Sequence, residues 1–330
     1  MLNDHIDIVI PWVDGADPAW LAEKAKYQPD SKSDVGVNRY RDWGTMKYWF
    51  RGIEKFAPWI NKIHFITWGH LPKWLNTENP KLHIVNHKDY IPEEYLPVFS
   101  SHPIELNMHR IEGLSEKFVY FNDDTFLISP VTPETFFQNN LPVDNMVEVV
   151  MRFMPGGIDH IIGNDMSIIN KHFPKGETIR KNKKQWFSFK AIKPTLKNMY
   201  MLPINRFSAF DNQHLPVPLL KSTIEEVWEK EPELMKATSS HKFRNMEDVN
   251  QWLFRYWQFV TGKFVQSKKP SGQFFSIGRD NAQIEDTIIN KRHKLICLSD
   301  DTTTLDFEKE SKTIIQLFES ILPEKSSYEK

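Results

Sequence analysis

Apolar positions along the chain fall into two patterns, short and predominantly apolar runs and longer stretches with a helical repeat. Short apolar runs predict strands buried on both faces, and apolar residues at i, i+3 and i+4 predict amphipathic helices. The runs predict strands over residues 6–10, 63–67, 82–85, 118–121, 143–150 and 294–298. The helical spacing predicts helices over residues 44–56, 219–230, 248–260 and 305–322, with a further helix within 99–110.

This alternation of strands and helices predicts an α/β fold with a βαβ-type, mainly parallel sheet. The sequence contains no internal repeat and no clean linker, so residues 1–330 are predicted to form a single domain. Residues 155–290 interrupt the alternation, and they predict a largely helical insertion or subdomain within that domain.

The apolar run at 118–121 stops at Asn122, Asp123 and Asp124. In open α/β sheets, ligands bind at the carboxyl ends of the strands, where these three side chains would lie. Two adjacent carboxylates repel each other unless a cation or hydrogen-bond donors satisfy them. The pair therefore indicates a metal site, although a plain strand-to-turn junction uses the same residue types.

Asp7 places a second carboxylate inside the apolar run at 6–10. Burying a carboxylate costs several kcal/mol unless it is paired or hydrogen-bonded. Two interpretations follow: Asp7 lies at a frayed strand start and faces water, or it is held beneath a functional site.

Residues 171–197 form a basic and aromatic block, with nine Lys or Arg against the single acidic Glu177. Trp186, Phe187 and Phe189 are interleaved with these cations. Such a block can contact an anionic polymer or the surface of an acidic membrane. The competing interpretation is a solvated insertion loop.

Composition narrows the function classes only slightly. The 330 residues carry a formal net charge of −1, so global charge points to no partner and a nucleic-acid-binding role is disfavoured. Cys297 is the only cysteine, which excludes an internal disulfide framework and a zinc site built from cysteines. Without a signal-peptide pattern or an apolar run of about 18 residues, we expect a cytoplasmic protein, with peripheral contact at the inner face of the plasma membrane through 171–197 as an option.

Four segments resemble, in order, the four conserved regions of the Stealth family. They are residues 6–18 (IDIVIPWVDGADP), 39–128 (from RYRD through RGIEKFAPWINKIHFIT to HRIEGLSEKFVYFNDDTFL), 211–248 and 294–301. The second segment covers about 90 residues almost without a gap, and the four together cover roughly half of the chain. The family includes bacterial capsular polysaccharide phosphotransferases and the α/β subunit of the lysosomal-enzyme N-acetylglucosamine-1-phosphotransferase.

The resemblance implies a Rossmann-like core similar to that of nucleotide-sugar transferases, and transfer of a sugar-1-phosphate to a glycan hydroxyl. The implied donor is a nucleotide-diphosphate sugar, expected to be UDP-linked as in UDP-GlcNAc, and the acceptor is a polysaccharide or lipid-linked oligosaccharide. The product would be a phosphodiester in capsular or exopolysaccharide, with release of a nucleoside monophosphate.

The same resemblance implies the site residues. Asp7, Asp124, His214 and Arg244 match catalytic positions, and Asp123 with Asp124 would hold Mg²⁺ or Mn²⁺. Of the substrate-binding candidates, only Arg152 comes from the resemblance. Arg51 and Arg110 are added because an Arg fork suits phosphate, and Asn122 because it adjoins the acidic pair. Asp300 and Asp301 match the acidic end of the fourth region, where Ser299 replaces the usual Asn.

Three alternatives stay open at this stage. His214 can act as general base or attack phosphorus itself, which would give a phosphohistidine. A conventional metal-dependent glycosyltransferase would use a similar fold and donor but release a nucleoside diphosphate. A non-catalytic protein that binds glycans or membranes through residues 171–197 is the third reading.

Overall fold

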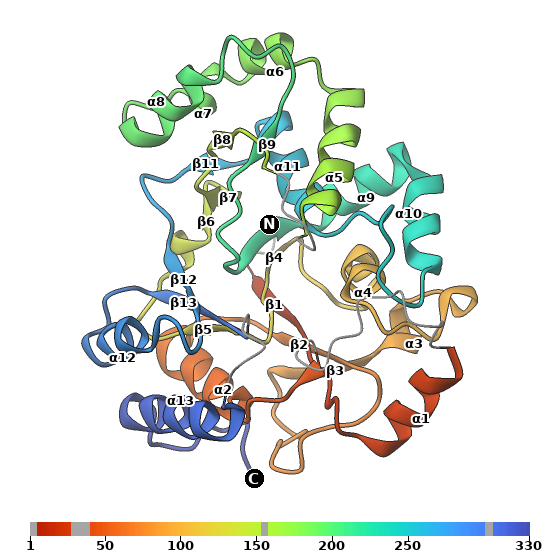
Figure 1. Ribbon diagram of the computed structural model, residues 1–330, viewed down its shortest axis with the longest axis vertical. Coiled ribbons are helices and arrows are strands. Elements are labelled where there is room, and N and C mark those ends of the chain that lie inside the picture. The colour runs from red at the N-terminus through yellow and green to blue at the C-terminus, as the bar shows by residue number, and fades with distance from the viewer. Residues whose placement is uncertain (1–4, 28–39, 153–157, 301–305) are drawn as a thin grey trace.

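The computed structural model describes residues 5–27, 40–152, 158–300 and 306–330. A five-stranded sheet with the order β10-β4-β1-β2-β3 lies at its centre (Figure 1). Its strands are β1 (Ile6–Pro11), β2 (Ile63–Thr67), β3 (Leu82–Asn86), β4 (Lys117–Tyr120) and β10 (Val217–Leu220). The first four run parallel and β10 pairs antiparallel with β4, so the expected α/β fold with a mainly parallel sheet is confirmed.

Alternate side chains of β1 enter two different cores. Ile8 and Ile10 join a cluster on one face of the sheet, while Val9 joins a cluster on the other face. Because strand side chains alternate between faces, an unbroken apolar run requires cover on both sides. Helices supply that cover.

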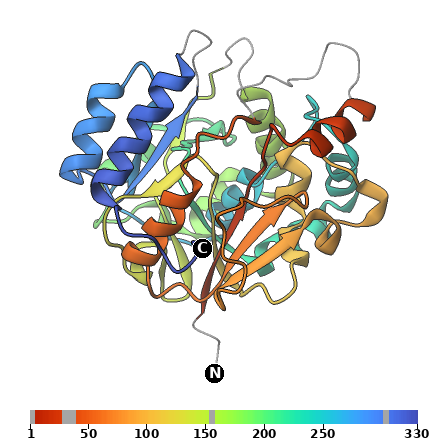
Figure 2. The ribbon, with the colours of Figure 1, turned by 90° about the horizontal axis from the view of Figure 1, so that it is seen from below.

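One face is covered by α2 (Met46–Phe56), α12 (Asn281–Asn290) and α13 (Phe307–Ile321). Figure 2 shows α12 and α13 side by side on one flank, with α1 (Pro18–Tyr27) on the opposite flank. Helix α2 approaches its neighbouring strand closely at Gly52, where an added Cβ would lie 2.9 Å from the Leu127 carbonyl oxygen. Glycine at this position therefore allows the helix to pack directly on the strand.

The other face is covered by helices that come mostly from the predicted insertion. They are α4 (Ser101–Leu106), α5 (Asp159–His172), α9 (Lys221–Lys230), α10 (Pro232–Ser240) and α11 (Trp252–Thr261). Helix α11 lies at the centre of this layer, and Leu253, Phe254 and Trp257 pack in one cluster with Val9 and Phe118 of the sheet. The helices of the insertion and the central sheet thus share one hydrophobic core.

A second, three-stranded sheet stands beside the first. It consists of β12 (Gly272–Ser276), β13 (Leu295–Ser299) and β5 (Thr125–Leu127). Strand β5 begins one residue after Asp124, so the chain leaves the central sheet and enters the second sheet through the two aspartates. The Asp pair therefore lies at the junction of two sheets.

The remaining elements are short, and two predictions about them need correction. The single strand predicted over 143–150 is wrong: β7 (Leu141–Asp144) and β8 (Glu148–Val149) pair with different partners, and Asn145 between them bonds to the Ser267 carbonyl. The helix predicted over 219–230 begins at Lys221, after β10.

Other elements are α3 (His87–Tyr90), α6 (Lys175–Lys181), α7 (Lys183–Trp186), α8 (Ile192–Tyr200), β6 (Phe137–Gln138), β9 (Ala209–Phe210) and β11 (Val265–Gln266).

Within the described residues, none of the helices combines the length and apolar content that a membrane-crossing segment needs.

Candidate active site

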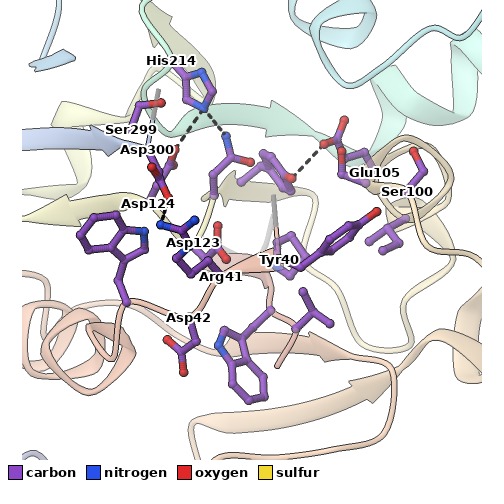
Figure 3. Close-up of a pocket in the computed structure, with 18 of the residues that line it drawn as sticks. Tyr40, Arg41, Asp42, Ser100, Glu105, Asp123, Asp124, His214, Ser299 and Asp300 are labelled. Atoms are coloured by element: carbon purple, nitrogen blue, oxygen red, sulfur yellow. Dashed lines mark hydrogen bonds and ion pairs between the residues drawn. The ribbon is translucent and has the colours of Figure 1, made fainter. Parts of the chain in front are cut away.

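A cleft of about 590 Å³ opens at the carboxyl edge of the central sheet. The residues after β1, β4 and β13 form its floor, and the loop that carries His214 contributes to its wall (Figure 3). Arg244 also lines the cleft. Asn122, Asp123 and Asp124 all line it. The structure therefore brings together the acidic pair, the histidine and one of the arginines that the sequence analysis singled out.

The two aspartates differ in their surroundings. Asp123 is open to the cleft, yet the surrounding protein atoms, together with the charges of Asp124 and Asp42, raise the pKa of its carboxyl to about 7. Asp124 is half-buried, and its backbone oxygen accepts a hydrogen bond from the Leu298 amide at 2.9 Å. That bond ties the acidic turn to β13.

His214 is held in an uncommon backbone conformation, with φ of 47°. Left-handed φ is rare in non-glycine residues and is often found at functional sites. Its Nε2 lies 3.2 Å from the Asn122 amide nitrogen and 3.5 Å from Asp124 Oδ2. The imidazole therefore faces the acidic turn across the cleft, and Figure 3 shows both contacts.

Arg255 fixes the loop that carries His214. The guanidinium is buried, binds both carboxylate oxygens of Asp144 at 2.7 and 2.9 Å, and donates from Nη1 to the Asp211 carbonyl and to Asn212 Oδ1. A bidentate ion pair of this kind sets direction as well as energy. Arg255 thus connects helix α11 to the two residues at the start of the His214 loop.

Asp248 plays the same part for the loop that carries Arg244. This fully buried carboxylate accepts hydrogen bonds from His102 Nδ1 at 2.8 Å, from His241 Nδ1 at 2.6 Å and from the Asn245 amide at 2.9 Å. Because these donors lie on both sides of Arg244 and on α4, the loop is tied to the body of the protein.

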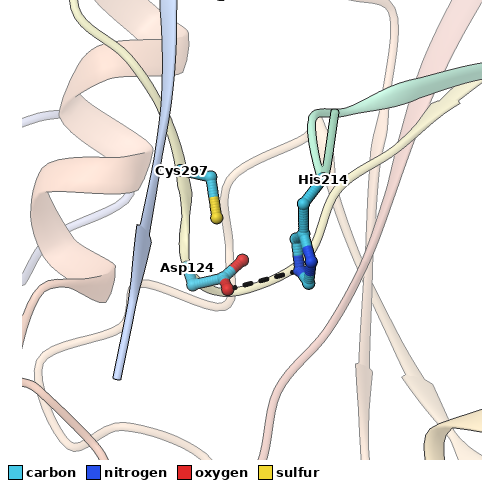
Figure 4. Close-up of side chains that lie close together, drawn as sticks. All are labelled: Asp124, His214 and Cys297. Atoms are coloured by element: carbon cyan, nitrogen blue, oxygen red, sulfur yellow. Dashed lines mark ion pairs between the residues drawn. The ribbon is translucent and has the colours of Figure 1, made fainter. Parts of the chain in front are cut away.

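The donor atoms around the acidic turn suit a cation. Asp124, His214 and Cys297 each present one ligand atom within 4.8 Å of the others (Figure 4). Thiolate and imidazole favour softer metals such as Zn²⁺, whereas carboxylates favour Mg²⁺ or Mn²⁺. Desolvation by the surrounding protein atoms and repulsion by Asp124 and Asp42 raise the pKa of Asp123, and a nearby positive charge would lower it again. The carboxylates of the cleft therefore fit the expected divalent cation.

Three cleft residues were absent from the predicted site or given only a minor place in it. Arg41 lines the cleft, where Nη1 lies 3.4 Å from Asp300 Oδ2. Asp42 also lines it, and burial followed by the nearby Asp14 raises the pKa of its carboxyl. Asp300 enters from the end of β13, the second strand-to-acid junction of the sequence. Asp301 lies outside the described residues.

The structure does not bring Asp7 to the cleft. Its carboxylate is fully buried near the start of β1, where it accepts hydrogen bonds from Asn61 Nδ2 at 2.7 Å and from the Ser115 amide at 2.8 Å, and lies 3.3 Å from His64 Nε2. Burial alone would raise the pKa of Asp7, but these bonds outweigh it and hold the pKa below its ordinary value. These contacts are those of a structural carboxylate.

Three of the predicted arginines also lie outside the cleft. Arg51 is buried and binds both oxygens of Glu329 at 2.8 and 2.9 Å, so it anchors the end of the chain. Arg110 is exposed and stacks on Trp228, with its guanidinium carbon 4.7 Å from the ring centroid. Arg152 is exposed on a separate groove. Within the part of the chain that the structure describes, no contact of these three arginines reaches the acidic turn.

The fold and cleft define an α/β protein whose sheet edge presents carboxylates, an imidazole and guanidinium groups to one ligand. Family models for Stealth conserved regions 1, 2 and 3 match residues 4–32, 39–144 and 213–260. The chain is 41% identical over 330 residues to the capsular polysaccharide phosphotransferase WcwK of Streptococcus pneumoniae, covering 99% of this chain and 98% of that one. It is 40% identical to the receptor polysaccharide phosphotransferase WefC of Streptococcus oralis, covering 99% of both chains.

This protein belongs to the Stealth family, as its sequence resemblance indicated. The fourth conserved region at 294–301 stays a prediction. Among solved structures, the galactosyltransferase LgtC resembles 97% of the chain with 10% identity and a TM-score of 0.37. Similarity this remote adds nothing to the assignment.

Proposed function

We propose that this protein transfers a sugar-1-phosphate from a UDP-linked sugar to a hydroxyl of a capsular or exopolysaccharide glycan, and releases UMP. The chain is a transferase of the Stealth family, and its full-length relatives are named polysaccharide phosphotransferases. One observation carries the proposal: Asp123, Asp124, His214 and Arg244 line the same cleft although they are far apart in the sequence.

Asp123 and Asp124 would hold Mg²⁺ or Mn²⁺, and Asp300 is a third carboxylate in the same cleft. Bound there, the cation would offset negative charge on the donor pyrophosphate. The protein's own part is to keep these carboxylates together in spite of their repulsion. It does so by fixing the acidic turn between β4 and β5 and by tying it to β13 through the Leu298 amide.

His214 is the group that can take the acceptor's proton. In a one-step reaction, the acceptor oxygen attacks the phosphorus that bears the sugar, the bond from this phosphorus to the bridging oxygen breaks, and the hydroxyl proton moves to His214 Nε2. Asp124, 3.5 Å from that nitrogen, would stabilise the imidazolium that forms. In a two-step reaction, Nε2 attacks phosphorus and UMP leaves, which gives a phosphohistidine. The acceptor oxygen then attacks the same phosphorus, the bond between phosphorus and Nε2 breaks, and histidine is regenerated.

Arg244 and Arg41 are the cleft cations available to the phosphates. A guanidinium binds two phosphate oxygens at once and keeps its charge at every physiological pH. Aromatic side chains, among them Trp12, Tyr40 and Trp43, line the same cleft and offer surfaces on which a base or sugar can stack. The cleft therefore contains recognition groups for each part of a nucleotide sugar.

The released nucleotide tests the reaction directly. Purified protein is incubated with UDP-sugars, Mn²⁺ or Mg²⁺ and a glycan acceptor, and the nucleotide is identified by chromatography. UMP is the expected product, because attack falls on phosphorus. Release of UDP with transfer of the bare sugar would overturn the proposal in favour of a conventional glycosyltransferase.

The two roles of His214 are separated with a donor labelled in its β-phosphate. If a phosphohistidine forms, the protein becomes labelled in the absence of acceptor, through a bond that acid cleaves and base does not. General-base catalysis leaves the protein unlabelled. His214→Ala is expected to lower turnover at least about a hundredfold in either case, the scale of one lost acid–base group. Retained activity in this variant would remove His214 from the catalytic residues.

A further inference from the structure

The basic and aromatic block at residues 171–197 separates into an internal part and an external part. Lys175 is buried and donates to Glu148 at 2.8 Å, and Lys171 pairs with Glu231 at 2.5 Å. These cations are used within the protein. The external part is centred on α8, at the end of the arm of helices at the upper left of Figure 1.

Helix α8 exposes a row of large apolar side chains. Ile192, Leu196, Met199 and Tyr200 lie at i, i+4, i+7 and i+8 on one side of the helix, and all four are exposed. Phe189, just before the helix, is 99% exposed and Tyr200 is 82% exposed. We call these five residues the α8 face. Contiguous exposed apolar surface of this kind marks an interaction site.

The orientation of α8 is fixed from its other side. Pro194 and Asn198 are buried, and Asn198 Oδ1 accepts a hydrogen bond from the Glu148 amide of β8 at 2.8 Å. Because this contact holds the helix against β8, the α8 face points away from the protein.

The charge around the α8 face has one sign. Residues 178–210 contain eight Lys or Arg and no Asp or Glu. Lys190, Lys193 and Lys197 flank the apolar row, are exposed, and form no ion pair within the described residues. A ligand for this surface must therefore accept apolar side chains and carry negative charge beside them.

We propose that the α8 face binds a membrane surface that contains anionic phospholipid. A helix with an apolar row and flanking lysines lies in the plane of a bilayer, with its apolar side chains among the acyl chains and its lysines at the headgroups. The one-sided positive charge favours this occupant over a second copy of the chain, because two α8 faces in contact would bring like charges together.

A second groove runs from the α8 face to the loop that leads to His214. Leu196 and Tyr200 line this groove, of about 750 Å³, and so do Asp211 and Asn212 of that loop. Membrane docking would therefore place one end of the groove at the bilayer and the other at the start of the His214 loop. This consequence, a path for a lipid-linked acceptor, rests on the proposed function, whereas the docking itself does not.

Vesicle sedimentation tests the docking without nucleotide sugar or acceptor, so its outcome is independent of the proposed reaction. The wild-type protein should sediment with vesicles of phosphatidylglycerol and phosphatidylcholine, and stay in solution with phosphatidylcholine alone. Changing Lys190, Lys193 and Lys197 to Glu should weaken binding at least about a hundredfold, because each basic residue at an anionic surface contributes roughly fivefold. The matched control changes three exposed lysines at the opposite end of the molecule, Lys309, Lys312 and Lys325, to Glu, and should bind like the wild type.

A dye at Leu196 gives a second measurement. Cys297 is the only cysteine and is buried, so Leu196→Cys can be labelled selectively with an environment-sensitive fluorophore. Anionic vesicles should shift its emission to the blue, and brominated lipid should quench it. Absence of sedimentation by the wild type, or equal binding by the triple Glu variant, would overturn the proposal. A dimer that Leu196→Asp dissociates, without vesicle binding, would instead assign the α8 face to a second copy.

Discussion

Asp7 and Asp123 belong to neighbouring strands of one sheet but lie at opposite ends of it, and folding shifts the pKa values of their carboxyl groups in opposite directions. Asp7 is enclosed at the amino-terminal end of β1, where hydrogen bonds from His64, Asn61 and Ser115 outweigh burial and lower its pKa. Asp123 follows β4 at the carboxyl end and is open to the cleft, where desolvation by nearby protein atoms and the charges of Asp124 and Asp42 raise its pKa to about 7. An aspartate carboxylate is therefore hydrogen-bonded at one end of the sheet and repelled by other carboxylates at the other end.

The difference separates a carboxylate that stabilises the fold from one that the proposed function can use. A carboxylate that the protein itself satisfies contributes to folding, because hydrogen bonds to a charged group are among the stronger ones. A carboxylate beside like charges lowers the free energy of unfolding, and a ligand with positive charge would offset the repulsion. A raised carboxyl pKa at the carboxyl edge of the sheet therefore supports the proposed site, whereas burial of an aspartate alone does not.

The largest effect is expected for Asp124→Asn. This change removes one charge from the proposed cation site and from the contact with His214, so turnover should fall at least about a hundredfold. Nucleotide release from a UDP-sugar measures it, and chelation of divalent ions should abolish the wild-type rate. Asp286→Asn, on the exposed side of α12, is the matched control and should keep full activity. Equal rates for the two variants would contradict the assigned cleft.

Asp7→Asn should act on stability instead. Loss of charge from the hydrogen-bonded carboxylate should lower the free energy of unfolding by about 2 kcal/mol. Since folding lowers the pKa of Asp7, its contribution is complete above the unfolded pKa of about 3.9 and is lost as the pH falls through the folded value. Urea titrations should therefore show a constant difference from pH 5 to 8 and a smaller one below about pH 4. Turnover per folded molecule should stay at the wild-type level, and a large loss would return Asp7 to the active site.

The sequence predicted the parallel strands of the central sheet well, because each of them is a short and predominantly apolar run. Strand β10 escaped prediction because Pro218 interrupts its pattern, and the sheet tolerates that proline because β10 is an edge strand. Residues 143–150 were expected to form one strand, but Asn145 bonds to Ser267, which lies 122 residues away in the sequence. Contacts of that range leave no trace in a local pattern.

The proposed site was predictable where its chemistry is local. Asp123 and Asp124 followed from one strand end, while the roles proposed for His214 and Arg244 came from family resemblance. The sequence could not show that Arg51 is a buried, structural arginine, because its partner Glu329 lies 278 residues along the chain. The sequence does contain a sign that Arg255 is buried and paired. An arginine between Phe254 and Tyr256 in an apolar helix must find a buried partner.

Arg255→Lys should have an intermediate effect. A lysine cannot reproduce the bidentate contact with Asp144 together with the bonds to Asp211 and Asn212, so the His214 loop should lose its fixed orientation. We expect kcat to fall about tenfold, with the KM for donor little changed, since misplacement of a reacting group lowers the rate more than binding. Arg292→Lys, an exposed arginine paired with Asp286, is the control. An unchanged kcat would show that the loop holds its position without Arg255.

Asp123→Asn gives the smallest stability change and the sharpest contrast with Asp7→Asn. Folding raises the pKa of Asp123, so its favourable contribution is present below the unfolded pKa and is lost as the pH rises through about 7. At pH 8 the ionised carboxylate therefore opposes folding of the metal-free protein, and asparagine should stabilise it. We expect a gain below about 1 kcal/mol, because the cleft is open to solvent, and the gain should shrink toward pH 5. Metal-free thermal unfolding at the two pH values measures this gain, and the same variant should lose turnover. A stabilised but inactive Asp123→Asn beside a destabilised but active Asp7→Asn is the outcome that the two ends of the sheet predict, and the reverse pair would contradict it.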